Sequence, residues 1–153
     1  MKKKKKEKLK NFSVKKDNGK VKKTDRKKEE REKIKVKKEE LKEYSNDLGI
    51  VGIHAFTLQT INNNTAHCRN FAPYVGIDEE AATGTASGAL GVYLINEEIK
   101  KLNDNNEANF IFEQGYFMNR KSEIACDIKK EDNSYNVVVG GKATICIKGD
   151  IYI

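Results

Sequence analysis

The chain has 153 residues, a formal net charge of +7 and a hydrophobic fraction of 37%. Such a length allows one domain, or one domain with a tail, and no uninterrupted apolar stretch matches the length of a bilayer-spanning helix. Residues 1–43 carry 21 Lys and Arg against 9 Asp and Glu, while the remainder carries 9 against 14. The basic pI, which would favour a polyanionic partner, therefore describes only the first part of the chain.

Residues 1–32 are lysine-rich and of low complexity, with Leu9, Phe12, Val14 and Val21 isolated among polar residues. Burial of so few apolar groups cannot offset the entropy of ordering the segment, so we expect a disordered basic tail. It is either an arm that contacts RNA or an anionic membrane, or a solvated segment. The absence of aromatic or Arg-Gly interleaving favours the latter. The initial lysine run resembles the n-region of a signal peptide, but no apolar h-region follows, which predicts a cytoplasmic protein.

Chain order then predicts a connecting surface helix and two strands, at residues 33–48, 50–58 and 65–71. The helix carries apolar side chains among charged ones at helical spacing and ends at Gly49. The strands are apolar runs, and a series of turn-forming Asn residues separates them. Pro73 ends the second strand and leads into a loop that continues to Thr83.

A helix of small residues follows and is expected at residues 83–102, with Thr83 as its capping residue. Gly84, Gly88 and Gly91 each weaken a helix by about 1 kcal/mol relative to Ala, so close packing must compensate. Because the first half of this helix is small or apolar on every side, we expect it to be buried and surrounded by sheet.

Short strands complete the chain and are expected at residues 109–117, 122–129, 134–139, 142–147 and 151–153. Their regular spacing and Gly- or Asn-containing turns predict an antiparallel meander. The predicted fold class is therefore α+β, an antiparallel sheet or barrel wrapped around a central buried helix. The predicted organisation is a tail at 1–32, a connecting helix at 33–48 and one folded domain at 49–153.

The start of the small-residue helix is a candidate anion site. Backbone N–H groups at a helix start have no partners inside the helix, and the helix dipole adds positive potential, so Gly84, Thr85 and Ala86 are expected to hold a carboxylate or phosphate. Glu80 precedes them, and a carboxyl group beside an anion site is a candidate acid or base. Arg69 either clamps a second substrate oxygen or pairs with a nearby acidic residue.

A structural interpretation of the same residues stays open at this point. The acidic residues at 78–80 would then only favour the helix start electrostatically, and Thr83 would cap it.

The cysteines and histidines predict no metal centre. The chain has three cysteines, Cys68, Cys126 and Cys146. An odd number, wide spacing and apolar surroundings favour buried reduced thiols over disulfides or a zinc site. With only two histidines, no metal-ligand spacing appears. His67 and Cys68 are neighbours in an expected strand and point to opposite faces, which argues against a nucleophile and base pair.

Three stretches of the chain carry a family resemblance: RNFAPYVGIDEEAATGTASGALGVYL at 69–94, FEQGYFMNRKS at 112–122 and VVVGGKATICIKGDIYI at 137–153. In order and spacing they resemble the C-terminal half of the PhzF-like (phenazine biosynthesis-like) family, which has the diaminopimelate epimerase fold. The motifs of that family read approximately RxFAPxxGxxEDxATGSAxGxLxxYL, QGxxMGRPS and VGGxAxxxxxGxL. The similarity extends from about Gly49 to Ile153.

The resemblance implies a reaction and a missing part. Family members have two similar domains, each a sheet around a central helix, with the active site between them. The implied chemistry is isomerisation without metal or cofactor, in which a proton leaves one carbon and is returned elsewhere on a small carboxylate-bearing substrate. In the best understood member the substrate is a dihydro-hydroxyanthranilate. The principal acid/base is a glutamate of the N-terminal domain, which nothing in this chain resembles, so the chain alone is expected to be inactive.

Carried over position by position, Glu80 matches the assisting acid of the second domain, where Asp is usual. Gly84, Thr85 and Ala86 match the anion-binding turn, with Thr85 in the usual place of Ser. Substrate-binding roles are also expected for Arg69 and for the pair Gln114 and Gly115, which match the QG motif near the cleft. Arg120 and Ser122 match the Arg and Ser of the GRPS motif. Asn119 and Lys121 replace its Gly and Pro, and Asn tolerates positive φ, so the loop conformation is expected to be kept.

Three functional hypotheses remain from the sequence. The chain complements a separate N-terminal half, or it forms a homodimer that mimics the missing domain pair. Alternatively, it is a non-catalytic binding module or a truncated relic whose basic tail contacts RNA or anionic membrane.

Overall fold

The computed structural model of this chain describes residues 36–145 and 147–151. Contacts divide the chain into two units, 1–34 and 35–153, and all described residues lie in the second. The predicted disordered tail at 1–32 and the first part of the predicted connecting helix lie outside the described residues.

The connecting helix α3 spans Lys38–Leu48 and ends where the sequence predicts. Gly49 adopts a left-handed conformation with φ 66°, and its N–H donates to the carbonyl of Asn46. The N–H of Ile50 reaches back to the carbonyl of Ser45 at 3.0 Å. These bonds satisfy carbonyl groups that the last helical turn leaves open, and glycine permits the φ that they require.

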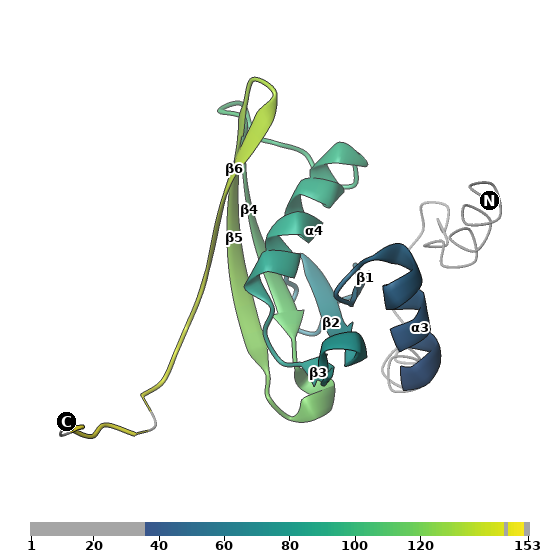
Figure 1. Ribbon diagram of the computed structural model, residues 1–153. Helices are drawn as coiled ribbons and strands as arrows, with labels where there is room; N and C mark the ends of the chain where they lie inside the picture. Colours follow the sequence, from purple (N-terminus) through teal and green to yellow (C-terminus); the bar gives the residue numbers. More distant parts are fainter. Residues whose placement is uncertain (1–35, 146, 152–153) are drawn as a thin grey trace. The chain divides into compact units, whose positions relative to one another are not determined.

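One open sheet of six strands forms the body of this unit (Figure 1). The strands are β1 (Ile53–Thr57), β2 (Ala66–Ala72), β3 (Ile77–Glu80), β4 (Glu107–Gln114), β5 (Ser122–Glu131) and β6 (Ser134–Gly141). Their order is β1-β2-β4-β5-β6, and β3 pairs with β2 beside this row. Two short 3-10 helices, η1 (Pro73–Val75) and η2 (Tyr116–Met118), follow β2 and β4. Pro73 thus ends β2, as predicted, but β3 lies where only a loop was expected.

The sheet is mixed, which corrects the prediction of an antiparallel sheet or barrel. The antiparallel meander is confirmed for β4, β5 and β6, but β2 and β4 run parallel, with His67 opposite Glu113. Parallel neighbours need a crossover connection, and helix α4 (Gly84–Asn96) lies in the chain between these two strands. Helix α4 supplies this crossover, so β2 and β4 can pair in parallel. The regular hairpin spacing of the later strands indicated only antiparallel pairing.

Helix α4 packs on the sheet through its small residues. A methyl group at Gly91 would lie 2.5 Å from Ile128 Cδ1 and 3.2 Å from Phe110 Cδ2, and one at Gly88 would lie 3.1 Å from Val137 Cγ1. Glycine at these positions lets the helix axis approach the strands more closely than side chains would allow. The predicted close packing is confirmed.

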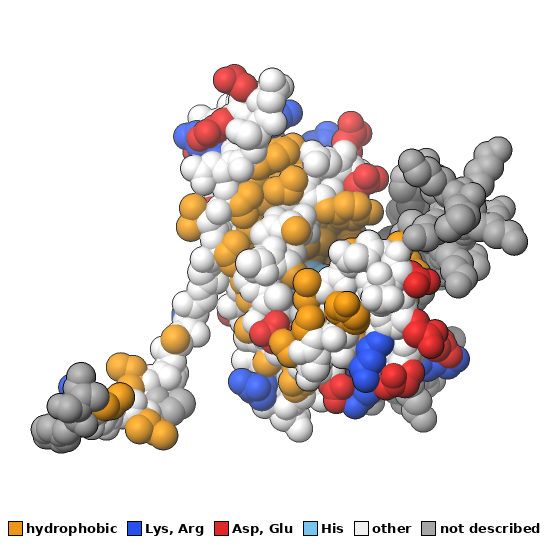
Figure 2. Space-filling model, in the orientation of Figure 1, with side chains coloured by type: hydrophobic (Ala, Val, Ile, Leu, Met, Phe, Trp, Pro, Cys, Tyr) orange, Lys and Arg blue, Asp and Glu red, His pale blue; other side chains and the backbone are white. Residues whose placement is uncertain are grey.

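The other side of α4 is open among the described residues. Tyr93 is 42% exposed, and hydrophobic side chains are visible over α4 in the view of Figure 2. The helix ends at Asn96 rather than near residue 102, because the N–H groups of Ile99 and Lys100 both turn back to the carbonyl of Leu94. Complete enclosure of this helix by sheet stays a prediction.

The core lies between α4 and the inward faces of β2, β4 and β5. It contains the buried hydrophobic residues Ala66, Cys68, Leu90, Leu94, Ala108, Phe110, Phe112, Ile124, Cys126 and Ile128. In β5 the inward residues alternate with exposed ones, as the period of a strand requires. Cys68 and Cys126 are free thiols in this core, as predicted, whereas Cys146 lies outside the described residues.

The predicted strand at 142–147 is wrong for the residues that the structure describes, whereas most of the predicted strand at 151–153 lies outside them. Residues 142–145 and 147–151 form no strand, and the segment leaves the sheet after β6 (Figure 1). Ile145, Ile147 and Ile151 are 85%, 89% and 90% exposed. Alternating apolar residues favour a strand, but a strand also needs a neighbour to pair with, and none of the described strands lies beside this segment.

None of the helices in the described part of the chain combines the length and hydrophobicity that crossing a membrane requires.

We expect Gly91→Ala to lower the free energy of unfolding by up to about 2 kcal/mol, measured by urea denaturation. Overpacking costs about 1–3 kcal/mol and outweighs the gain in helix propensity of about 1 kcal/mol. Gly140→Ala is the control, because nothing lies within 4 Å of the added methyl group. Stabilisation by Gly91→Ala would contradict the close packing of α4.

Candidate functional site

The junction between β3 and α4 brings together the residues that the sequence singles out. Strand β3 pairs with β2, with Asn70 opposite Glu80, so Glu80 is fixed by the sheet immediately before the helix begins. Its side chain is half-buried, and Thr83 Oγ1 donates to its Oε2 at 2.8 Å. We call Glu80, Thr83, Gly84, Thr85 and Ala86 the β3–α4 site.

Thr83 occupies the N-cap position of α4, as predicted, but its hydroxyl group does not cap the helix. The hydroxyl group turns to Glu80 instead, so the predicted capping hydrogen bond is wrong. A threonine at this position ordinarily accepts from the N–H of the second or third helical residue. Here the Thr83 hydroxyl group donates to Glu80, three residues earlier, and does not bind the N–H groups of the helix.

The start of α4 consequently presents free donors. Among the described residues, none accepts a hydrogen bond from the backbone N–H of Gly84, Thr85 or Ala86. The first backbone bond of the helix runs from Ser87 N–H to the carbonyl of Thr83 at 3.1 Å. Three N–H groups and the positive end of the helix dipole therefore directly follow Thr83, whose hydroxyl group binds the carboxylate of Glu80.

Gln114 lies directly behind the β3–α4 site and is fully buried. Its Nε2 donates to the Glu80 carbonyl at 2.7 Å and to Thr83 Oγ1 at 3.0 Å, and its Oε1 accepts from the Thr83 N–H at 3.3 Å. Every polar atom of this amide contacts the β3–α4 segment. The structure thus places Gln114 against the backbone of the site.

Gly115 allows this approach. Its φ is +77°, and an added methyl group would lie 2.2 Å from the Arg120 carbonyl oxygen and 2.8 Å from that of Ala81. The hydroxyl group of Ser122 contacts the same Ala81 carbonyl, which ties the loop before α4 to β5. Gly115 and Ser122 therefore hold the backbone of the loop that precedes the helix.

The turn after Gly115 contains a second residue with a positive φ. Asn119 has φ 54°, in the left-handed region, and ends helix η2. The N–H of Arg120 returns to the Gly115 carbonyl at 3.0 Å. Asn119 thus adopts the positive φ that the sequence predicted it would tolerate, whereas the likeness of this loop to that of the family stays a prediction.

Arg69 is paired with Glu79. Its Nε and Nη2 donate to the two carboxylate oxygens at 2.9 and 2.8 Å. The side chains are only 12% and 16% exposed, so this is a partly desolvated bidentate pair and not a surface contact. The guanidinium carbon also lies over the rings of Phe71 and Phe117, 4.8 and 4.5 Å from their centroids. Of the alternatives left open for Arg69, pairing with a nearby acidic residue is the arrangement observed.

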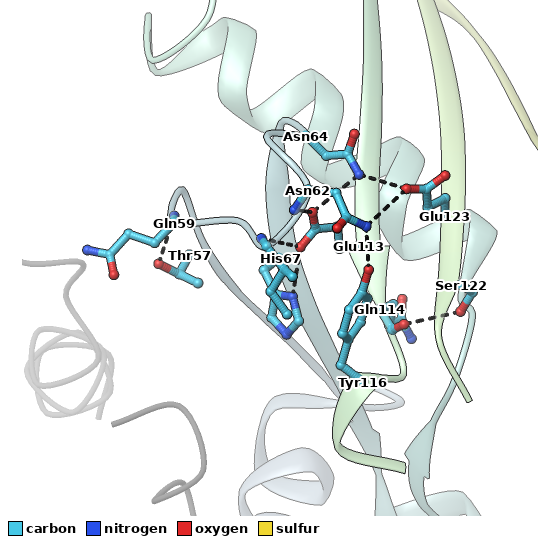
Figure 3. A network of polar contacts seen from close by, with 11 residues as sticks. Thr57, Gln59, Asn62, Asn64, His67, Glu113, Gln114, Tyr116, Ser122 and Glu123 are labelled. Atoms are coloured by element: carbon cyan, nitrogen blue, oxygen red, sulfur yellow. Dashed lines mark hydrogen bonds and ion pairs between the residues drawn. The ribbon is translucent and has the colours of Figure 1, made fainter. Parts of the chain in front are cut away.

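A second polar cluster surrounds Glu113, and the sequence analysis missed it (Figure 3). Glu113 is fully buried, and its carboxylate accepts from the N–H groups of Ile61 and Asn62 at 2.8 and 2.7 Å. Asn64 Nδ2 at 3.2 Å and His67 Nδ1 at 3.1 Å complete its partners. We call this set the Glu113 network; it anchors the loop between β1 and β2.

One sequence signal pointed to the Glu113 network, namely an acidic residue inside the apolar run of β4. Charged residues are almost never fully buried without partners, so this position predicts a set of donors. Which donors they are depends on the parallel pairing of β2 and β4, which the sequence pattern did not reveal.

The neighbours His67 and Cys68 point apart, as predicted. His67 contacts Glu113, while Cys68 belongs to the core. Burial raises the pKa of the Cys68 thiol to about 12, with a smaller contribution from Glu113. Burial likewise raises the pKa of Cys126 to about 11. Both thiols are therefore protonated at neutral pH, the opposite of an activated nucleophile.

No group of three or more His, Cys, Asp or Glu side chains in the described part of the chain is arranged to hold a metal ion.

Comparison with known proteins identifies related sequences and a related fold. The model of the phenazine biosynthesis-like protein family (PhzC-PhzF) matches residues 8–149. An uncharacterized isomerase of Deinococcus radiodurans is 35% identical over 104 residues, which make up 67% of this chain and 33% of that protein. An uncharacterized isomerase of Schizosaccharomyces pombe is 31% identical over 101 residues, 65% of this chain and 53% of its own.

A solved structure shares the fold. The crystal structure of a Bacillus anthracis phenazine biosynthesis protein of the PhzF family matches with a TM-score of 0.61 at 24% identity, over 72% of this chain and 38% of that chain. The chain thus spans between about a third and a half of the length of these relatives.

We expect Glu113→Gln to lower the free energy of unfolding by about 2–4 kcal/mol, because the amide turns an NH2 group toward donors that need an acceptor. Urea denaturation measures the loss, and amide hydrogen exchange at Ile61 and Asn62 locates it. Glu123→Gln is the control, since this exposed carboxylate receives only side-chain donors and its replacement should cost less than about 0.5 kcal/mol. Equal losses in the two variants would contradict the structural role of Glu113.

Proposed function

The chain belongs to the phenazine biosynthesis-like protein family, and on that premise we propose that it is the C-terminal, substrate-holding half of a cofactor-independent isomerase. The observation that carries this proposal is the β3–α4 site. A carboxylate held on one oxygen by Thr83 shares this segment with three backbone N–H groups to which no described residue offers an acceptor. The names of two relatives as isomerases support the reaction class.

The proposed roles follow from the chemistry of the groups. The N–H groups of Gly84, Thr85 and Ala86 hold the carboxylate of a small substrate, because oriented backbone dipoles bind anions without a competing counter-charge. The principal glutamate of a complementary N-terminal domain removes a proton from one carbon. A proton is then added at another carbon with Glu80 assisting, so one C–H bond breaks, one forms and no electrons are gained or lost.

The departures from the family pattern bear on the substrate. Glu80 replaces the usual Asp and extends the carboxylate by one methylene group, so its reactive oxygen lies further from the backbone than in the family pattern. Arg69 is held by Glu79, the neighbour of Glu80 in β3, so in this proposal it contacts substrate only if that pair opens. Gln114 and Gly115 lie behind the site rather than in its opening.

The proposed partner is a complementary domain that closes the other side of the site. Hydrophobic side chains lie exposed on the segment that leads into the site, with Tyr74 51%, Val75 49% and Ile77 40% exposed. Apolar surface of this kind beside a candidate site favours a macromolecular partner. In this proposal the same partner also covers the exposed side of α4, where Tyr93 is 42% exposed. A second copy of the chain is the alternative occupant.

The test is to mix the full chain with the remaining part of the Deinococcus radiodurans relative and follow deuterium incorporation from D2O by NMR. The probe is a dihydro-hydroxyanthranilate. We expect no exchange by either component alone, exchange in the mixture, and a loss of roughly 100-fold or more with Glu80→Gln. Exchange by this chain alone, or association without exchange of the probe, would contradict the proposal as stated.

A further inference from the structure

The buried amide of Gln114 has a fixed orientation. Its NH2 group donates to the Glu80 carbonyl and to Thr83 Oγ1, while its Oε1 accepts from the Thr83 N–H. Turning the amide over would bring its NH2 group against the donating Thr83 N–H and its oxygen against the accepting Glu80 carbonyl. The hydrogen-bond pattern therefore assigns the amide in one way only.

This orientation fixes the direction of the next hydrogen bond. Because Thr83 Oγ1 accepts from Gln114, its single proton is left for Glu80 Oε2, 2.8 Å away. Glu80 Oε2 is thus an acceptor. No described residue donates a hydrogen bond to the other oxygen, Oε1. One oxygen of the carboxylate is held and the other is open.

We infer that Gln114, acting through Thr83, is the positioning residue of Glu80 rather than a substrate-binding residue. Gln114 holds both ends of the Glu80 residue, its carbonyl directly and its carboxylate through the threonine hydroxyl group. The same relay keeps that hydroxyl group from capping α4, so the N–H groups of the helix start stay open. This inference rests on the proposed function, since positioning matters only where Glu80 takes part in proton transfer.

The first arm of the test needs no activity. In the full chain, NMR three-bond couplings of labelled glutamate report whether the Glu80 side chain occupies one rotamer. We expect the Glu80 side chain to occupy a single rotamer in the natural chain and to average over rotamers in Thr83→Val. In Thr83→Ser, which keeps the hydroxyl group, we expect a single rotamer again. Gln114→Glu keeps the size of the side chain and an acceptor for the Thr83 N–H. Its new carboxylate attracts the Thr83 proton, so it should also release Glu80.

Two outcomes of this arm overturn the inference: an averaged Glu80 in the natural chain, or an unchanged rotamer in Thr83→Val and Gln114→Glu. Urea denaturation shows whether each variant folds. If Gln114→Glu does not fold, the comparison of Thr83→Val with Thr83→Ser decides whether the hydroxyl group holds Glu80.

The second arm uses the complemented enzyme. We expect Thr83→Val to lower kcat roughly 10- to 100-fold with little change in KM, because the held carboxylate loses its orientation but the anion-binding N–H groups remain. Recovery of kcat in Thr83→Ser would support positioning, and a change in KM alone would contradict it. If the natural chain shows no activity with any complement, the proposed function fails, while the rotamer measurements still decide whether Gln114 positions Glu80.

Discussion

The close approach of α4 to the sheet is the constraint on which the rest of the structure depends. Gly88 and Gly91 place the helix so near β5 and β6 that a single methyl group at Gly91 would collide with Ile128. Because this helix is also the connection between the parallel strands β2 and β4, its position fixes where the chain enters from β3. That packing thereby positions both ends of the β3–α4 segment, Glu80 at the end of β3 and the free N–H groups at the start of α4.

Strand β4 then organises polar groups on both faces of the sheet. Glu113 and Gln114 are neighbours, so their side chains point to opposite faces, and both are fully buried. Glu113 receives donors from the β1–β2 loop, whereas Gln114 holds the segment between β3 and α4. A buried polar group costs stability unless it has hydrogen-bond partners. In both networks these partners combine backbone groups of neighbouring segments with side chains, Asn64 and His67 for Glu113 and Thr83 for Gln114. The same strand thereby orders a structural loop and the candidate site.

The sequence predicted the parts of the fold that depend on local pattern. Gly49 as a helix end, Pro73 as a strand end and the β4–β6 meander rest on turn chemistry and on alternation, which neighbouring residues determine. The parallel pair β2–β4 and strand β3 depend on residues distant in sequence, so alternation could not reveal them. Strands at 142–147 and 151–153 were expected from apolar alternation, but such a pattern says nothing about whether a pairing partner exists.

The sequence predicted which residues make up the candidate site better than it predicted what each of them binds. A helix start after an acidic turn indicated Glu80 and Gly84, but whether the Thr83 hydroxyl group caps the helix or binds Glu80 depends on Gln114, 31 residues later in the chain.

The most direct test of the account is an NMR titration of the full chain with 2-aminobenzoate, with neutral 2-aminobenzamide as control. We predict saturable shifts centred on the amides of Gly84, Thr85 and Ala86 for the carboxylate alone. Shifts confined to lysine-rich segments, or equal shifts with the neutral amide, would contradict a substrate-holding half-site.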